Sequence, residues 1–201
     1  MSTVVWAACS APESWELTSN DGNIRFRLQH QDGSLSYLVY YDDTMLIVES
    51  PLGIMMDSNS YGDNVRFAAS SLITKVDHDA GDANQAYQEQ TYSFLTTQGE
   101  LFDVIVRIYN DAVTFRYGFP WKESQMRHIH SESTDFNLPV HAEESSQPFL
   151  YEINDYWLLL DGTLSGDTYV PELPWYTPWH SIYIAEDSSY FARDDYKKVL
   201  P

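Results

Sequence analysis

The segment that most constrains the fold lies near the middle of the chain, from Phe102 to Phe119, and reads FDVIVRIYNDAVTFRYGF. Apolar and polar residues alternate on both sides of Asn110-Asp111, a dipeptide typical of tight turns. If the chain folds back there, Arg107, Thr114 and Arg116 share one face, and the opposite face carries four apolar pairs. These pairs are Ile108–Val113, Val106–Phe115, Val104–Tyr117 and Phe102–Phe119. The segment therefore predicts an antiparallel β-hairpin with one buried face.

The same period of two recurs along much of the chain. Residues 24–28 alternate between apolar side chains and arginine, and Asp32-Gly33 then forms a turn signal before a second alternating run. Residues 170–178 hold three prolines, so we expect them to be extended but unpaired. No segment has a helical period, so the sequence predicts an all-β fold, an antiparallel β-sandwich with little helix. The strands that we expect are residues 24–28, 35–41, 45–48, 65–76, 87–96, 156–160 and 182–185.

Length and composition fit one globular domain. The chain has 201 residues, of which 43% are hydrophobic, enough to bury a sizeable core. We expect a single β-sandwich domain over residues 15–201. Residues 1–14 are expected to be a leader or the remnant of an export signal, because a short apolar run before Cys9 resembles the end of a bacterial lipoprotein signal. As Cys9 is the only cysteine, a disulfide within the chain is excluded.

The chain is strongly acidic, with a formal net charge of −19. Nucleic acids and anionic membrane surfaces are therefore excluded as partners, because both require clustered lysine and arginine. We interpret the acidity as a solvated surface rather than as a binding site. No apolar run is long enough to predict a membrane span.

Few residue patterns point to chemistry. His128 and His130 would share one face of a strand, as metal ligands can, but no third ligand stands nearby and Arg127 disfavours a cation. The acidic loop at residues 77–82 lacks the ordered positions and closing glutamate of an EF-hand, and Glu143-Glu144 lies in a polar segment. Neither a nucleophile elbow nor a glycine-rich phosphate loop is present. Solvated surface is the better interpretation of each group.

Five phrases, in order along the chain, resemble the N-terminal β-sandwich domain of glycoside hydrolase family 97. Members of that family carry a phrase like VRxYNDGVAFRY, which stands here as VRIYNDAVTFRY over residues 106–117. The resemblance implies a large mutarotase-like supersandwich. The other phrases are SNDGNI at 19–24, ESPLGI at 49–54, ESTDFNLP at 132–139 and TPWHSI at 177–182.

The resemblance also implies a function. Family members continue from this domain into a (β/α)8 barrel that holds the catalytic carboxylates, and they cleave α-glucosidic or α-galactosidic bonds with the help of calcium. No catalytic residue can be assigned in this chain, which is expected to be inactive alone. The family supplies one calcium-binding glutamate from this domain, and Glu152, in LYEINDY, stands at the similar position. Glu186, the competing candidate, follows the closing TPW phrase and is placed at the end of the domain instead.

Aromatic residues gather near the end of the domain, where Trp157, Trp175, Tyr176 and Trp179 lie within 23 positions. Flat rings can stack on sugars, so Trp157 and Trp179 are the candidate substrate-binding residues. For Trp179, core packing or a contact with the barrel is the first expectation. The expected partners are a carbohydrate and the catalytic barrel, and the expected location is periplasmic, extracellular or lipid-anchored in a bacterium. The alternatives are a free-standing carbohydrate-binding or scaffold protein and a truncated product without activity.

Overall fold

The computed structural model describes residues 13–77, 86–121, 127–145, 149–161, 168–170 and 175–192. The predicted all-β class is confirmed: the described residues form β-strands joined by turns, with one short 3-10 helix at Ser188–Ala192. Part of the expected leader falls outside these ranges, and Glu13 and Ser14 already belong to the first strand. The described part of the chain holds no helix with the length and hydrophobicity that a bilayer span requires.

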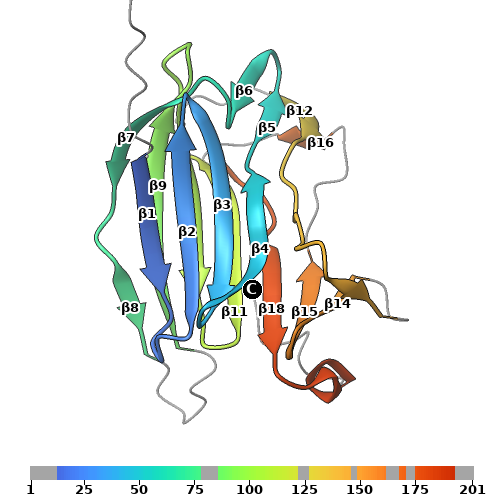
Figure 1. Ribbon diagram of the computed structural model, residues 1–201. Coiled ribbons are helices and arrows are strands. Elements are labelled where there is room, and N and C mark those ends of the chain that lie inside the picture. The colour runs from blue at the N-terminus through green and yellow to red at the C-terminus, as the bar shows by residue number, and fades with distance from the viewer. Residues whose placement is uncertain are drawn as a thin grey trace, which may run out of the picture.

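Two sheets face each other and a third lies at one end of them (Figure 1). Every strand pairing among the described residues is antiparallel. The small sheet has the order β1 (Glu13–Thr18), β2 (Ile24–Gln31), β3 (Ser34–Tyr41), β4 (Thr44–Pro51). The end sheet has the order β16 (Thr168–Val170), β12 (Arg127–Glu132), β5 (Ile54–Met56), β6 (Asn59–Tyr61).

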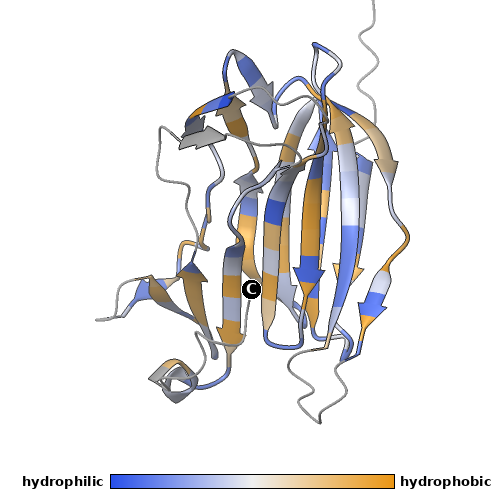
Figure 2. Ribbon diagram, turned by 180° about the vertical axis from the view of Figure 1, so that it is seen from behind, coloured by the Kyte–Doolittle hydropathy of each residue, from blue (hydrophilic) through white to orange (hydrophobic). Residues whose placement is uncertain are grey.

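The large sheet forms the other layer of the sandwich. Its strand order is β13 (Glu143–Glu144), β14 (Leu150–Ile153), β15 (Tyr156–Asp161), β18 (His180–Ala185), β11 (Ala112–Phe119), β10 (Leu101–Ile108), β9 (Tyr87–Leu95), β7 (Arg66–Ser70). Two short strands join it from the side: β17 (Trp175–Tyr176) pairs with β11, and β8 (Thr74–Val76) pairs with β9. Figure 2 looks onto this sheet, whose strands alternate between hydrophobic and hydrophilic segments.

The predicted central hairpin is β10 and β11. Ile108–Val113, Val106–Phe115 and Val104–Tyr117 are direct cross-strand partners, as expected. All eight predicted apolar side chains of the hairpin are fully buried in one core. The core lies between the facing sheets: Phe115 of the large sheet contacts Tyr37 of the small sheet, with ring centroids 5.1 Å apart, and Phe26 stacks on Tyr37. Burial of one face of each sheet is what a β-sandwich requires.

Most of the expected strands and turns are present. Asp32 and Gly33 both have positive φ (51° and 86°), as a two-residue hairpin turn requires. Two expectations were wrong in detail. Residues 65–76 form two strands rather than one, separated at residues 71–73. Residues 170–178 are not wholly unpaired, because Trp175 and Tyr176 pair with Phe119 and Gly118, where Trp175 stacks on the Phe119 ring.

Candidate functional site

Two of the predicted site residues are neighbours on the outer face of the large sheet. Glu152 on β14 lies directly opposite Trp157 on β15, and Trp157 lies opposite Ala185 on β18. The next pair along, Leu158 and Ile184, is buried in the main core. Because side chains alternate along a strand, Glu152, Trp157 and Ala185 form one row on the opposite, outer face.

A small second cluster covers this part of the outer face. Its buried members are Leu150, Leu159 and Phe191, and Trp157 packs against them together with Tyr190. Phe191 and Tyr190 belong to the short 3-10 helix that follows β18. Trp157 is half-buried and Glu152 is exposed. The arrangement leaves Trp157 partly accessible beside a carboxylate, which is compatible with a sugar contact.

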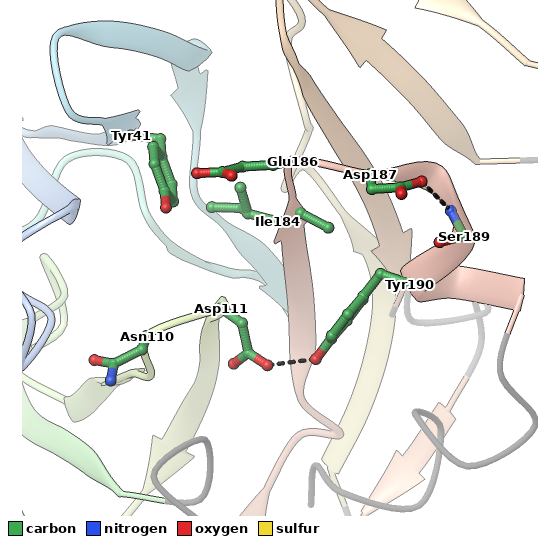
Figure 3. A pocket seen from close by; sticks show the side chains of 9 residues that line it. Tyr41, Asn110, Asp111, Ile184, Glu186, Asp187, Ser189 and Tyr190 are labelled. Atoms are coloured by element: carbon green, nitrogen blue, oxygen red, sulfur yellow. Dashed lines mark hydrogen bonds between the residues drawn. The ribbon is translucent and has the colours of Figure 1, made fainter.

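A cavity of about 360 Å³ lies next to this row, at the tip of the central hairpin (Figure 3). The hairpin contributes Asn110 and Asp111, the small sheet contributes Tyr41, and the end of β18 with the chain that follows it supplies the remaining wall. This last part comprises Ile184, Ala185, Glu186, Asp187, Ser189 and Tyr190. The volume lies within the range of small-molecule sites.

Hydrogen bonds hold the cavity walls together. The backbone N–H of Ile184 donates to the carbonyl of Asp111 (2.8 Å), and the Tyr190 hydroxyl donates to the Asp111 carboxylate (2.5 Å). Burial, together with the nearby Glu186 carboxylate, raises the pKa of Tyr41, so its phenol stays protonated at neutral pH. The lining contains three carboxylates and neither lysine nor arginine. Such a wall accepts hydrogen bonds from hydroxyl groups and repels anions.

Trp179 lies elsewhere, in a stack of rings and guanidinium groups on the outer face of β9, β10 and β11. The Arg107 and Arg116 guanidinium carbons lie 4.5 Å and 4.3 Å from the Trp179 ring centre. Arg107 also lies 4.6 Å from the Tyr87 ring, and Arg116 lies 4.3 Å from the Tyr176 ring. We call these five residues the arginine ladder. Each contact is a cation–π interaction, so two cations already engage the Trp179 ring.

The structure brings Glu152 and Trp157 together and keeps Trp179 in a separate group. The sequence did not single out Asp111, Tyr41 or Tyr190, because the cavity is assembled from segments far apart in the chain. The Asn110-Asp111 turn was the one local sequence feature at the cavity, and the sequence pattern predicted only a hairpin turn there. Glu186, which the sequence offered as the competing calcium ligand, lines the cavity.

Potential metal-binding side chains are scattered rather than clustered in the part of the chain that the structure describes. The His128 and His130 rings lie 4.2 Å apart, yet no group of three or more metal-binding side chains occurs within the described ranges. Calcium takes six to eight oxygen ligands. Within the described ranges, neither Glu152 nor Glu186 belongs to a group of three or more metal-binding side chains.

Comparisons with known proteins identify the family. A family model described as "Glycosyl-hydrolase 97 N-terminal" matches residues 17–157. A β-arabinopyranosidase shares the fold, with a TM-score of 0.68 and 19% identity, over 86% of this chain and 40% of that one. A glycoside hydrolase family 97 enzyme from Pseudoalteromonas sp. strain K8, solved with panose and with acarbose, has a TM-score of 0.68 and 16% identity, over 93% of this chain and 38% of that one.

A search of curated proteins finds no match. The chain thus spans about two fifths of the length of the enzymes whose fold it shares. The family model covers more than half of the chain, and the matched range includes the central hairpin. The chain belongs to the N-terminal domain family of the family 97 glycoside hydrolases.

Proposed function

We propose that this chain serves as the non-catalytic N-terminal domain of a family 97 α-glycosidase, bracing the catalytic barrel and forming part of the wall of its sugar site. The observation that carries the proposal is the family match together with the limited share, 38–40%, of each enzyme that the chain covers. The remaining length of such an enzyme would supply the chemistry. Glycoside hydrolysis requires two positioned carboxylates that exchange acid, base or nucleophile roles.

The sugar-facing wall in this proposal is the row of Glu152 and Trp157 with the adjoining cavity. Trp157 offers a half-buried ring for stacking, and the cavity offers carboxylate and amide groups for hydroxyls. Trp179 is the second candidate for substrate contact, although its two guanidinium neighbours favour a structural role. The solved relative binds panose and acarbose, which supports an α-glucoside as the sugar class, and an α-galactoside is the other class that we propose.

In this proposal, a calcium ion would be bound jointly by this domain and by the barrel. Glu152 would donate one carboxylate to an ion held mainly by the barrel, and Glu186 is the alternative donor from the cavity wall. Bound calcium would supply electrostatic stabilisation of developing charge near the sugar. An α-glycosidase of this kind would work outside the cytoplasm, as periplasmic, secreted or lipid-anchored protein.

The test is calorimetric titration of the pure chain with panose, acarbose, maltose and melibiose, with and without calcium, alongside hydrolysis assays on nitrophenyl α-glycosides. We expect no hydrolysis and weak sugar binding. The variants Trp157→Ala and Glu152→Gln should each weaken that binding. Glu49→Gln, on the small sheet away from this row, is the control and should leave binding unchanged. Hydrolysis by the pure chain would overturn the non-catalytic assignment, and absence of binding would remove the sugar-wall role.

One observation favours the alternative of a free-standing carbohydrate-binding protein. The cavity is built wholly from residues of this chain, so a sugar could bind there without any barrel. In that case the chain alone should bind sugar tightly and without calcium. Binding that is weak and calcium-dependent would instead favour the enzyme-domain assignment.

A further inference from the structure

Two histidine rings lie side by side on β12, in the end sheet (Figure 1). The ring centres of His128 and His130 are 4.2 Å apart, and the ring planes are inclined by 71°. Residues two positions apart on a regular strand are separated by about 6.7 Å, so these rings are turned toward each other. His128 is half-buried and His130 is exposed. Nitrogen donors from two side chains therefore meet at one place on the surface.

An irregularity of the strand accounts for this approach of the two rings. β12 pairs with β5 through Ile129 and Ser131, whose partners are consecutive residues of β5. His130 lies between them and is therefore the extra residue of a β-bulge. A bulge bends its strand and changes the direction of a side chain, and bulges are common beside functional sites. The backbone itself thus brings the His130 ring toward His128.

The neighbouring arginine, which the sequence weighed against a cation here, is neutralised in the folded chain. Arg127 pairs with Glu100 at 2.9 Å and with Asp57 at 3.0 Å, so two carboxylates surround one guanidinium. The Asp57 carboxylate also accepts a hydrogen bond from the His128 backbone N–H (3.1 Å), which places negative charge directly beside the pair. The net charge of −19 on the whole chain favours a cation as well.

We propose that His128 and His130 bind a divalent transition-metal ion, with Zn²⁺ and Cu²⁺ as the ions that fit. Imidazole nitrogen binds Zn²⁺ at about 2.0–2.1 Å and also suits copper and nickel, so rings this close can share one ion. Calcium and magnesium take oxygen ligands instead. The site is therefore chemically distinct from the calcium ion of the proposed function. The two histidines supply half of a tetrahedral shell, and water can complete it.

The experiment is a titration of the ¹⁵N-labelled chain with zinc chloride, followed by NMR at the imidazole nitrogens of its six histidines. Calcium chloride at the same concentrations is the blank, because an acidic surface attracts any divalent cation. We expect saturable shifts at His128 and His130 with Zn²⁺ and none with Ca²⁺. His130→Ala should weaken Zn²⁺ binding by at least about tenfold, since even the loss of an outer-shell partner costs that much. His141→Ala, at another exposed histidine, is the matched control.

Each outcome decides the proposal. Shifts at both rings, with affinity lost in His130→Ala and kept in His141→Ala, would support it. Equal shifts at all exposed histidines, or equal shifts with Ca²⁺, would reveal only general attraction of cations and would overturn it. A shift at one ring without the other would also overturn it, and this result needs no variant to fold. Sugar binding and hydrolysis play no part in these readouts, so this proposal and the proposed function fail separately.

Discussion

At the scale of single residues, His180 of the closing TPWH phrase makes a buried contact with Glu132. His180 Nε2 lies 2.5 Å from a Glu132 carboxylate oxygen, and the two side chains are 2% and 6% exposed. The His180 ring also stacks on Phe115, with centroids 4.9 Å apart and planes nearly parallel. Polar groups removed from water this completely are tolerated only as partners.

We therefore expect His180→Ala to lower the free energy of unfolding by about 3 kcal/mol, because it leaves the Glu132 carboxyl group buried without the imidazole and removes the ring that stacks on Phe115. Urea unfolding followed by tryptophan fluorescence measures the change. The double variant His180→Phe with Glu132→Leu removes both buried polar groups while keeping apolar volume, and it should be more stable than His180→Ala. A loss below about 1 kcal/mol in the single variant would show that the pair matters little.

A second residue-scale prediction concerns the close approach of two backbones at Gly62. A Cβ at this position would lie 2.6 Å from the Gly53 Cα and would overlap the Leu52 carbonyl. Backbone atoms cannot move aside as a flexible side chain can. We expect Gly62→Ala to cost about 3 kcal/mol, the upper end for overpacking. Gly118→Ala, which meets only the tips of Tyr176 and Ile105, is the control and should cost less in the same urea experiment.

At the scale of elements, a polar cluster joins the end sheet to the β9–β10 turn. The Glu100 carboxylate accepts hydrogen bonds from the Tyr61 hydroxyl (2.5 Å) and the Asn59 amide (2.7 Å), both on β6. Arg127 on β12 pairs with Glu100 at 2.9 Å and with Asp57 at 3.0 Å. Because every carboxylate oxygen of Glu100 has a partner, the cluster fixes how the end sheet meets the sandwich.

This cluster predicts a pH dependence of stability. Burial alone would raise the pKa of Glu100, but the hydrogen bonds from Tyr61, Asn59 and Arg127 outweigh it and lower the pKa below its usual 4.5. The contribution is therefore fully present above pH 4.5 and is lost as pH falls through the lowered value. Urea unfolding of the parent and of Glu100→Gln between pH 3 and pH 7 should show a difference that shrinks in acid.

The comparison with Glu100→Gln is needed because another carboxylate changes the pH dependence of stability in the opposite direction. Burial raises the pKa of Asp103, so its ionisation opposes folding as pH rises. Subtracting the variant curve from the parent curve removes the Asp103 contribution, since both proteins contain it. A difference that stays constant down to pH 3 would contradict the assigned role of Glu100.

At the scale of the whole molecule, net charge is the dominant electrostatic property. A charge of −19 on 201 residues produces self-repulsion that is larger in the folded state than in the expanded chain. Salt screens this repulsion, with a Debye length of about 10 Å at 0.1 M. We expect Tm to rise by about 3 °C, or roughly 1 kcal/mol, between 20 mM and 300 mM sodium chloride. A fall in Tm would mean that surface pairs such as Arg27–Glu16 outweigh the repulsion.

The sequence alone determined the all-β class, the central hairpin and the family. Residues 102–119 predicted their own register because alternation is a local property, and a one-residue slip would have turned the four apolar side chains of one strand away from the core. The polar turn at Asp32-Gly33 was equally predictable, since positive φ at both positions favours such residues. Burial of one hairpin face also followed, because those side chains have no other way to leave water.

Only the tertiary structure decided where the candidate site residues meet. Glu152 and Trp157 became neighbours through strand register, and the cavity joined Tyr41, Asp111 and Glu186 from three separated segments. Contacts between distant segments cannot be predicted from the alternation of polar and apolar residues, because that alternation reports only the local conformation of each segment.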